Sequence, residues 1–304
     1  MTNEQSRGVV YGVLAYVLWG AFPLYWPLLD KAGAFEVLGQ RIVWSLLFMT
    51  ALVVAIRHVA QLRALLADGR KVGILTIGAV LVTANWGTYI WAVNRDHVVE
   101  AALGYFINPL VTMLLGVVIF RERLRPLQWV ALGVAAAAVV VLTIDLGRLP
   151  YIALILAFSF GTYGLAKKKA DAGAFESLVV ETGVVAPFFL VYLVVLAARG
   201  DSHFTSEGPG LTALFILSGI VTALPLILFG AAATRVPMVS LGLLQYLAPI
   251  FQFALGVFVK HEQMSTGRWI GFAIVWLALA IFTWDALRGR RTQQPLVEAA
   301  EDLV

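Results

Sequence analysis

The pentapeptide AGAFE occupies residues 32–36 and returns unchanged at residues 172–176, an offset of 140. Apolar stretches that match by chance would favour Leu, Val and Ala, whereas this offset selects charged, aromatic and helix-breaking residues. The same ungapped register pairs Arg95 with Arg235, Pro109 with Pro249, Gly116 with Gly256, Glu122 with Glu262, Trp129 with Trp269, and Asp145 with Asp285. It therefore predicts a duplicated chain, with halves at residues 1–145 and 146–286.

The composition is that of a chain solvated by lipid. The 304 residues are 61% hydrophobic and 13% charged, with a mean hydropathy of +0.87. Soluble domains are roughly half apolar and a quarter charged, so this chain cannot cover a soluble surface. It has no cysteine, which excludes disulfides and thiolate metal sites. We expect no metal, because the four histidines lie far apart between apolar runs, and no cofactor is implied. We also expect no nucleic-acid partner, because the net charge of +4 comes without a basic-aromatic patch.

Ten apolar segments are long enough to cross a bilayer as helices, which need about 20 residues each. They predict an all-α membrane protein of ten transmembrane helices, arranged as two five-helix repeats. The spans are expected at residues 8–29, 35–56, 72–93, 99–120, 126–144, 149–166, 175–198, 211–233, 238–259 and 267–286.

The number of spans in each half decides their relative orientation. Five is odd, so the second half must enter the membrane from the opposite face, and the repeats are inverted. With the N-terminus in the cytoplasm, fifteen Lys and Arg residues fall on the cytoplasmic side and six on the other. This bias predicts that both termini are cytoplasmic. Residues 287–304 are expected to form a short, disordered cytoplasmic tail.

Several longer strings carry a family resemblance. They are RIVWS at 41–45, NWGTYIWAVN at 85–94, EAALGYFINPL at 100–110, AFSFGTYGLAKK at 157–168 and AAATRV at 231–236. Over residues 8–287 the chain resembles the RarD-type permeases of the drug/metabolite transporter superfamily, which carry two EamA-type repeats. The resemblance implies a ten-helix permease of the inner membrane. One departure is visible: the family usually has Gly before the Glu that closes the fourth span of each repeat, and here Arg121 and His261 stand there.

Prolines and polar groups inside the spans predict where a solute would bind. Pro109 and Pro249 are equivalent positions of spans four and nine, and paired helix breaks of this kind point to a midplane site. The alternative is a packing kink without a ligand. For the buried amides, hydrogen bonding between helices is an equally good alternative. The predicted cavity lining is Trp19, Asn85, Trp86, Tyr89, Tyr105, Asn108, Tyr163, Gln245 and Tyr246, whereas Trp26, Trp91, Trp129, Trp269 and Trp284 are assigned to the membrane interfaces.

Charged residues within or beside spans are the remaining candidates. Arg41 lies inside span two, and its repeat equivalent, Glu181, has the opposite charge. We predict that Arg41 pairs with Glu100 on the outer side and Glu181 with Arg235 on the inner side. These pairs could open and close as gates, or they could be permanent structural ion pairs.

These features favour a secondary transporter, an exporter of a small organic solute that works by alternating access. A channel or facilitator without ion coupling is the alternative. A membrane-embedded enzyme is disfavoured because no catalytic constellation is visible inside the spans. The expected partners are the lipid bilayer and a small-molecule substrate. The oligomeric state and the identity of the solute stay open.

Overall fold

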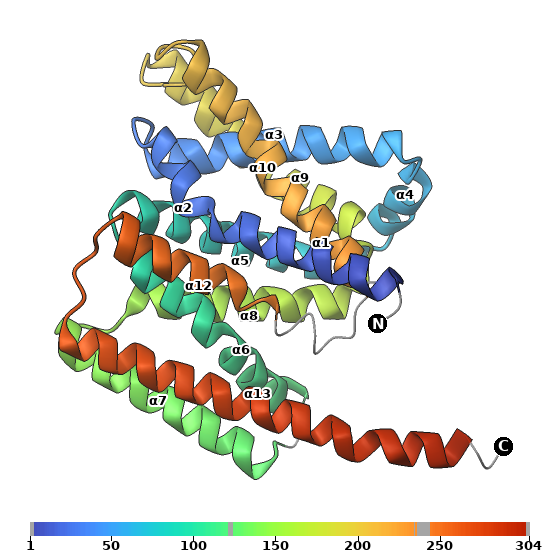
Figure 1. Cartoon of the computed structure of the whole chain (residues 1–304). Helices are drawn as coiled ribbons and strands as arrows, with labels where there is room; N and C mark the ends of the chain where they lie inside the picture. Colours follow the sequence, from blue (N-terminus) through green and yellow to red (C-terminus); the bar gives the residue numbers. More distant parts are fainter. Residues whose placement is uncertain (1–2, 121–123, 234, 236–243, 302–304) are drawn as a thin grey trace.

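The computed structural model describes residues 3–120, 124–233, 235 and 244–301, and all regular elements in these ranges are helical. The elements, labelled in Figure 1 where there is room, are α1 (Asn3–Gly20), α2 (Phe22–Tyr25), η1 (Trp26–Leu29), α3 (Ala34–Ala55), α4 (Val59–Ala67), α5 (Gly69–Asn94), α6 (Val98–Phe120), α7 (Pro126–Leu146), α8 (Tyr151–Ala170), α9 (Ala174–Ala198), α10 (Pro209–Ala233), α12 (Leu247–Ala254), η2 (Leu255–Val259) and α13 (Thr266–Glu301).

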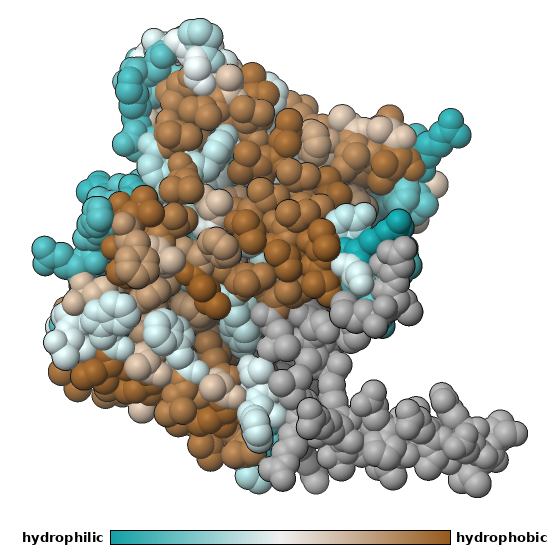
Figure 2. All heavy atoms as spheres, viewed as in Figure 1, coloured by the Kyte–Doolittle hydropathy of each residue, from teal (hydrophilic) through white to brown (hydrophobic). Residues whose placement is uncertain are grey.

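Seven helical segments are long and apolar enough to cross a membrane, and three shorter ones are apolar as well. The seven are Glu4–Leu29, Ala34–Ala55, Gly69–Asn94, Pro126–Leu146, Ala174–Ala198, Pro209–Phe229 and Thr266–Asp285; the three are Val98–Val111, Tyr151–Lys167 and Leu247–Val259. Figure 2 shows apolar surface across the middle of the visible face, with polar residues gathered toward the ends of the helices. This belt is what lipid requires of a helical membrane protein.

The repeated pentapeptide produces the same local structure twice. Gly33 and Gly173 are the N-caps of α3 and α9, with φ −55° and ψ 150° in the first and φ −55° and ψ 144° in the second. Glu36 and Glu176 then fall in the first turn of their helices, where the helix dipole favours a negative charge. The duplication seen in the sequence therefore extends to backbone conformation.

Two apolar cores hold the helices together. The first gathers buried residues of η1, α3, α5, α9 and α10, such as Trp26, Ile42 and Phe215. The second gathers residues of α6, α7, α12 and α13, such as Phe106 and Phe272. Helices α6 and α8 contribute to both cores, so they join the two groups of helices. In Figure 1 the α7–α13 pair of the second group lies antiparallel below the other helices.

Three segments differ from the sequence-based expectation. The first span is interrupted after Gly20, where Pro23 and Pro27 remove backbone donors and the chain continues as α2 and η1. The connection at 57–71 contains a helix, α4, that was not expected. The predicted disorder of the tail is wrong for residues 287–301, which continue α13 although Gly289 and Pro295 lie among them.

The two paired prolines lie in different local structures. α6 continues through Pro109 to Phe120, although Pro109 has no N–H to donate to the carbonyl oxygen of Tyr105. Pro249 lies in the first turn of α12, where the missing N–H leaves no helical bond unmade. The predicted midspan break is therefore wrong for Pro109 in α6, whereas the segment that contains Pro249 has a turn at Gln245 and Tyr246, just before α12 begins. Residues 238–243, which were expected to begin span nine, lie outside the described residues.

Glu262, in the loop before α13, caps the N-terminus of α6. Its carboxylate accepts hydrogen bonds from the backbone N–H groups of Val98 (2.6 Å) and Val99 (3.1 Å). The residue before it, His261, has φ +52°, a left-handed conformation that favours glycine. The turn therefore keeps the geometry of a glycine turn although histidine stands there. Arg121, at the equivalent place in the first half, lies outside the described residues.

Burial gives this cap a pH dependence. It raises the pKa of the Glu262 carboxyl from 4.5 to about 7, although the two N–H donors lower it. The folded protein therefore holds this proton more tightly than the unfolded chain, so the contribution to stability is present below pH 4.5 and is lost as the pH rises through 7. We expect the free energy of unfolding in detergent to fall by about 2 kcal/mol between pH 5 and pH 8, allowing for partial exposure. Glu262→Gln should remove this part of the slope; an unchanged slope would contradict the assignment.

Candidate functional site

The most unusual charged group of the structure is Arg41, in the second turn of α3. Its side chain is 2% exposed, and its Nε donates a hydrogen bond to the Thr222 hydroxyl of α10 (2.8 Å). Aromatic rings surround the guanidinium: its carbon lies 4.1 Å from the ring centroid of Trp86, 4.8 Å from that of Trp26 and 5.8 Å from that of Phe22. A cation–π contact of a desolvated group contributes about 2 kcal/mol, whereas burying a cation costs several. The rings offset part of this cost, but they supply no full negative charge opposite the guanidinium.

Polar atoms without partners surround this charge. Arg41 Nη1 makes no hydrogen bond to the described residues, and the same holds for Trp26 Nε1, the Tyr89 hydroxyl and the Ser45 hydroxyl, all buried. Tyr89 interacts electrostatically with Arg41, and Ser45 lies one turn further along the same face of α3. Buried polar atoms are normally hydrogen-bonded, so a cluster of this kind requires an explanation.

Asn85 joins three helices beside this cluster. Its amide nitrogen donates to the Leu156 carbonyl oxygen and to the Ser159 hydroxyl of α8, both at 3.0 Å. Its amide oxygen accepts from the Tyr105 hydroxyl of α6 (3.2 Å), and the Tyr105 ring lies 5.7 Å from that of Tyr89. Of the two alternatives for this amide, the structure therefore supports hydrogen bonding between helices.

The ion pairs are not those predicted from the sequence. Arg41 forms no ion pair with the described residues, and Glu100 instead binds Arg148 of the loop before α8, at 2.8 Å. Glu181 lies 3.1 Å from the Lys167 ammonium rather than beside Arg235. For Glu181 the reason is proximity: Lys167 lies in the last turn of α8, and the short connection to α9 returns the chain directly beside it.

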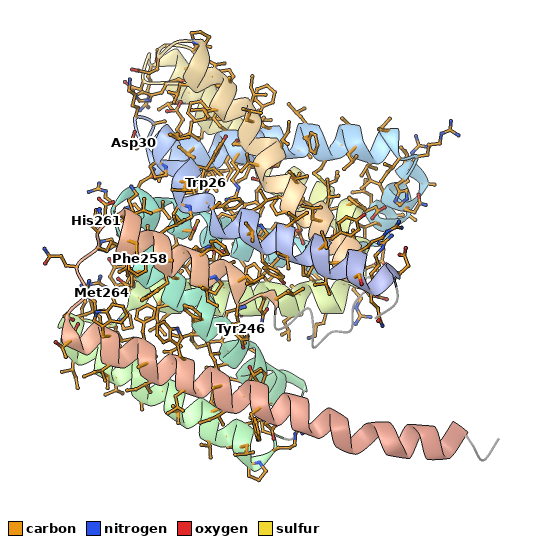
Figure 3. All side chains as sticks on the ribbon, in the orientation of Figure 1. Trp26, Asp30, Tyr246, Phe258, His261 and Met264 are labelled. Carbon is orange, nitrogen blue, oxygen red and sulfur yellow. The ribbon has the colours of Figure 1, made fainter. Side chains whose placement is uncertain are left out.

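The rest of the predicted lining is spread over three neighbourhoods. Tyr163 donates from its hydroxyl to Glu181 (3.0 Å), and Trp19 packs between Tyr16 and Phe229. Tyr246 packs against the α6–α13 core, next to the half-buried Gln245. Figure 3 shows that Tyr246 and Phe258 lie at opposite ends of the α12–η2 segment.

Two further predicted site residues, Asn108 and Arg235, have different surroundings. Asn108 is 9% exposed, and its amide oxygen has no partner among the described residues, so it could contact a solute. Arg235, predicted to pair with Glu181, lies 3.1 Å from the Glu4 carboxylate.

Two members of the Arg41 cluster were missed. Trp26 was assigned to the membrane interface, but it is fully buried, while Trp91, Trp129, Trp269 and Trp284 are exposed as expected of interfacial residues. Its position between Pro23 and Pro27, where the span is interrupted, was the available signal. Thr222 was also missed, although Ser218 and Thr222 form a polar face one turn apart in an otherwise apolar segment.

Comparison with known proteins identifies the family of this architecture. The model described as the EamA-like transporter family matches residues 6–144 and 150–284. The chain belongs to the EamA-like transporter family. Protein RarD of Streptomyces exfoliatus is 52% identical over 302 residues, which are 99% of this chain and 96% of the relative. "Uncharacterized transporter YojE" of Bacillus subtilis is 40% identical and covers 96% of this chain and 98% of its own.

The fold agrees with this assignment. A solved crystal structure superposes with a TM-score of 0.59 at 20% identity, over 93% of this chain and 98% of the other, which shows a common fold. This EamA-like protein is therefore a RarD-type permease and a multi-pass membrane protein. The family and the names of its relatives point to transport rather than to enzymatic catalysis.

The hydrogen bonds of Asn85 should contribute measurably to the stability of this EamA-like chain. We expect Asn85→Leu to lower the free energy of unfolding in detergent by about 2 kcal/mol, because it removes the hydrogen bonds of a buried amide and leaves the part-buried Tyr105 hydroxyl without its acceptor. Thr143→Val is the matched control: the Thr143 hydroxyl bonds only to the Val139 carbonyl of its own helix, so its loss should change stability little. Equal effects of the two substitutions would show that the network joining α5, α6 and α8 is unimportant.

Proposed function

We propose that this chain is a secondary transporter that exports a small organic solute across the inner membrane by alternating access. In this proposal ten spans form two inverted halves, residues 1–145 and 146–286, and both termini are cytoplasmic. It needs no cofactor. The partners are the lipid bilayer and the solute itself.

A reciprocal contact between α3 and α9 carries the proposal. Glu36, which begins α3, accepts hydrogen bonds from the His203 backbone N–H (2.8 Å) and the Ser202 hydroxyl (3.0 Å), just after α9. Glu176, the equivalent residue that begins α9, lies 2.7 Å from His58 Nδ1, just after α3. Each helix thus contacts the end of the other with the same residue of the repeat. This exchange of roles supports a pseudo-twofold relation between the halves.

The pair α7 and α13 repeats this arrangement. Asp145, at the end of α7, accepts a hydrogen bond from the Ser265 hydroxyl just before α13. Its repeat equivalent, Asp285 of α13, lies 3.2 Å from the Arg125 guanidinium just before α7. Two halves that can exchange conformations in this way provide the two states that alternating access needs.

Contacts between loops support the orientation. Lys31 pairs with Glu207 and Lys260 with Asp96, and all four are placed on the outer side by the basic-residue bias. Lys71 donates to the Asp171 carbonyl on the side assigned to the cytoplasm. In Figure 1 the start of α1 and the end of α13 lie toward the same side of the molecule.

A hollow on the cytoplasmic side of this arrangement offers an entry for the solute. Its volume is about 820 Å³, and α4, the start of α9 and the end of α10 line it. Apolar residues such as Phe175 and Ile227 make up part of the lining, together with Lys71 and Glu176. An opening of this size and character is compatible with a small amphipathic solute.

The test uses the cysteine-free chain. A single cysteine at Asn108 should react with a membrane-impermeant thiol reagent from either side of the membrane, and a bound solute should shift the ratio of the two rates. Flux of an amino-acid and drug panel into proteoliposomes, with and without a pH gradient, then identifies the solute. Saturable flux supports a transporter, whereas unsaturable flux together with unrestricted labelling from both sides would instead show the channel alternative.

A further inference from the structure

We propose that Arg41 binds the carboxylate of the transported solute, with the tryptophans beside it contacting the rest of that molecule. This inference rests on the proposed function and names its substrate class, an organic acid. The first observation is that the charge of Arg41 is not balanced by a nearby charge of opposite sign. The other buried charged side chains of the described residues are Glu36, Glu176, Glu181 and Asp285, and each has an ionic partner or a histidine within 4.0 Å. Arg41 has none.

The hydrogen-bonding groups around Arg41 indicate the sign and shape of the missing partner. Arg41 Nη1 and Trp26 Nε1 can only donate, and the hydroxyls of Tyr89 and Ser45 can donate as well. These four atoms are buried and have no partner among the described residues. A carboxylate is a pure acceptor with room for about four donors. It also matches the guanidinium, whose parallel N–H groups bind two carboxylate oxygens together.

The surrounding elements hold the guanidinium ready for such a ligand. The bond from Nε to Thr222 fixes the guanidinium against α10, which leaves Nη1 for another partner. Trp86 and Trp26 keep the site apolar, and an apolar site strengthens an ionic contact between Arg41 and a carboxylate. Their rings also favour a solute with an aromatic or other flat apolar part. Because α3, α5, η1 and α10 all contribute residues, a bound carboxylate would also join both halves of the chain.

Binding in detergent tests this inference without any need for flux. The probes are three acids, each matched with its amide: acetate and acetamide, phenylacetate and phenylacetamide, and indole-3-acetate and indole-3-acetamide. Calorimetry and the shift in Tm of the purified full chain measure the binding of each probe. We expect at least one acid to bind at least tenfold more tightly than its amide. Arg41→Gln should abolish this preference, whereas Arg199→Gln, at an exposed loop position, should not change it.

Two gentler variants keep the test valid if Arg41→Gln fails to fold. Tyr89→Phe and Ser45→Ala each remove one unpartnered donor, so without ligand they should leave Tm unchanged or slightly raised. Each should nevertheless weaken binding of the acid at least threefold and leave binding of the amide unaltered. A purely structural arginine would show neither effect.

Other outcomes overturn the inference. If no acid binds more tightly than its amide, or if both gentle variants keep full affinity for the acid, Arg41 is not a carboxylate site. If chloride or inorganic phosphate shifts Tm as strongly as the acids, the site takes simple anions and the substrate class is wrong. If neutral solutes show saturable flux that Arg41→Gln does not change, this inference is wrong and the proposed transport function is kept. If acids bind at Arg41 but no solute is transported, the carboxylate site is kept and the proposed transport function is wrong.

Discussion

Replacing Lys167 with methionine should lower the free energy of unfolding in detergent by about 3 to 5 kcal/mol. The Lys167 ammonium lies 3.1 Å from Glu181, whose side chain is 1% exposed, and it also donates to the Ser177 hydroxyl. Without this cation the buried carboxylate must stay charged and uncompensated or take up a proton, and both are costly. The Tyr163 hydroxyl, which donates to the same carboxylate, is too weak to replace a full charge.

A second substitution separates the charge effect from lost packing. Lys167→Met combined with Glu181→Gln removes both charges, so most of the lost stability should return. Lys31→Met is the matched control at an exposed ion pair: Lys31 lies 2.7 Å from Glu207 but is 64% exposed, so its loss should leave the stability nearly unchanged. Chemical denaturation of the purified variants measures all three. A double variant no more stable than Lys167→Met would contradict the ion-pair explanation.

Gly219→Ala is expected to destabilise the protein by about 2 to 3 kcal/mol. A Cβ atom at Gly219 of α10 would lie 2.6 Å from the backbone carbon and oxygen of Trp44 in α3, and a backbone cannot move aside as a flexible side chain can. The two helices would have to separate at the crossing that also holds the Arg41–Thr222 hydrogen bond. Small residues at such crossings allow the close approach on which helix packing in membranes depends.

Gly133→Ala provides the comparison. Gly133 lies within α7, and a Cβ atom added there would have no other atom within 4 Å. Alanine is the better helix former, so this change should be neutral or slightly stabilising. Thermal unfolding in one detergent compares the two variants. Equal Tm values would show that α3 and α10 do not pack as closely as described.

The starts of helices were well predicted from the sequence, whereas the residues that pair with each buried charge were not. The AGAFE repeat predicted where α3 and α9 begin, because a glycine followed by an acidic first turn acts locally. The partner of Glu181 was also within reach, since Lys167 is only 14 residues away across a short connection. In contrast, Arg41 and Thr222 are 181 residues apart, so their contact depends on how the two halves pack.

The depth of aromatic residues was predicted less well for a related reason. Trp26 was placed at the membrane interface because it stands near the end of an apolar run. The prolines around it end the regular helix, and this lets the chain turn inward so that the ring is fully buried beside Arg41. Distance along a sequence gives depth only where a helix is continuous, and this span is not.

The measurement that tests the central claim most directly labels two cysteines, each introduced alone. Ala34→Cys and Ala174→Cys place the thiol in the same pentapeptide of the two halves, at the start of α3 and of α9. A membrane-impermeant maleimide applied to intact cells should label Ala34→Cys, whereas Ala174→Cys should react only after the membrane is permeabilised. Labelling of both cysteines from the same side would contradict the inverted repeat, and with it the account of transport given above.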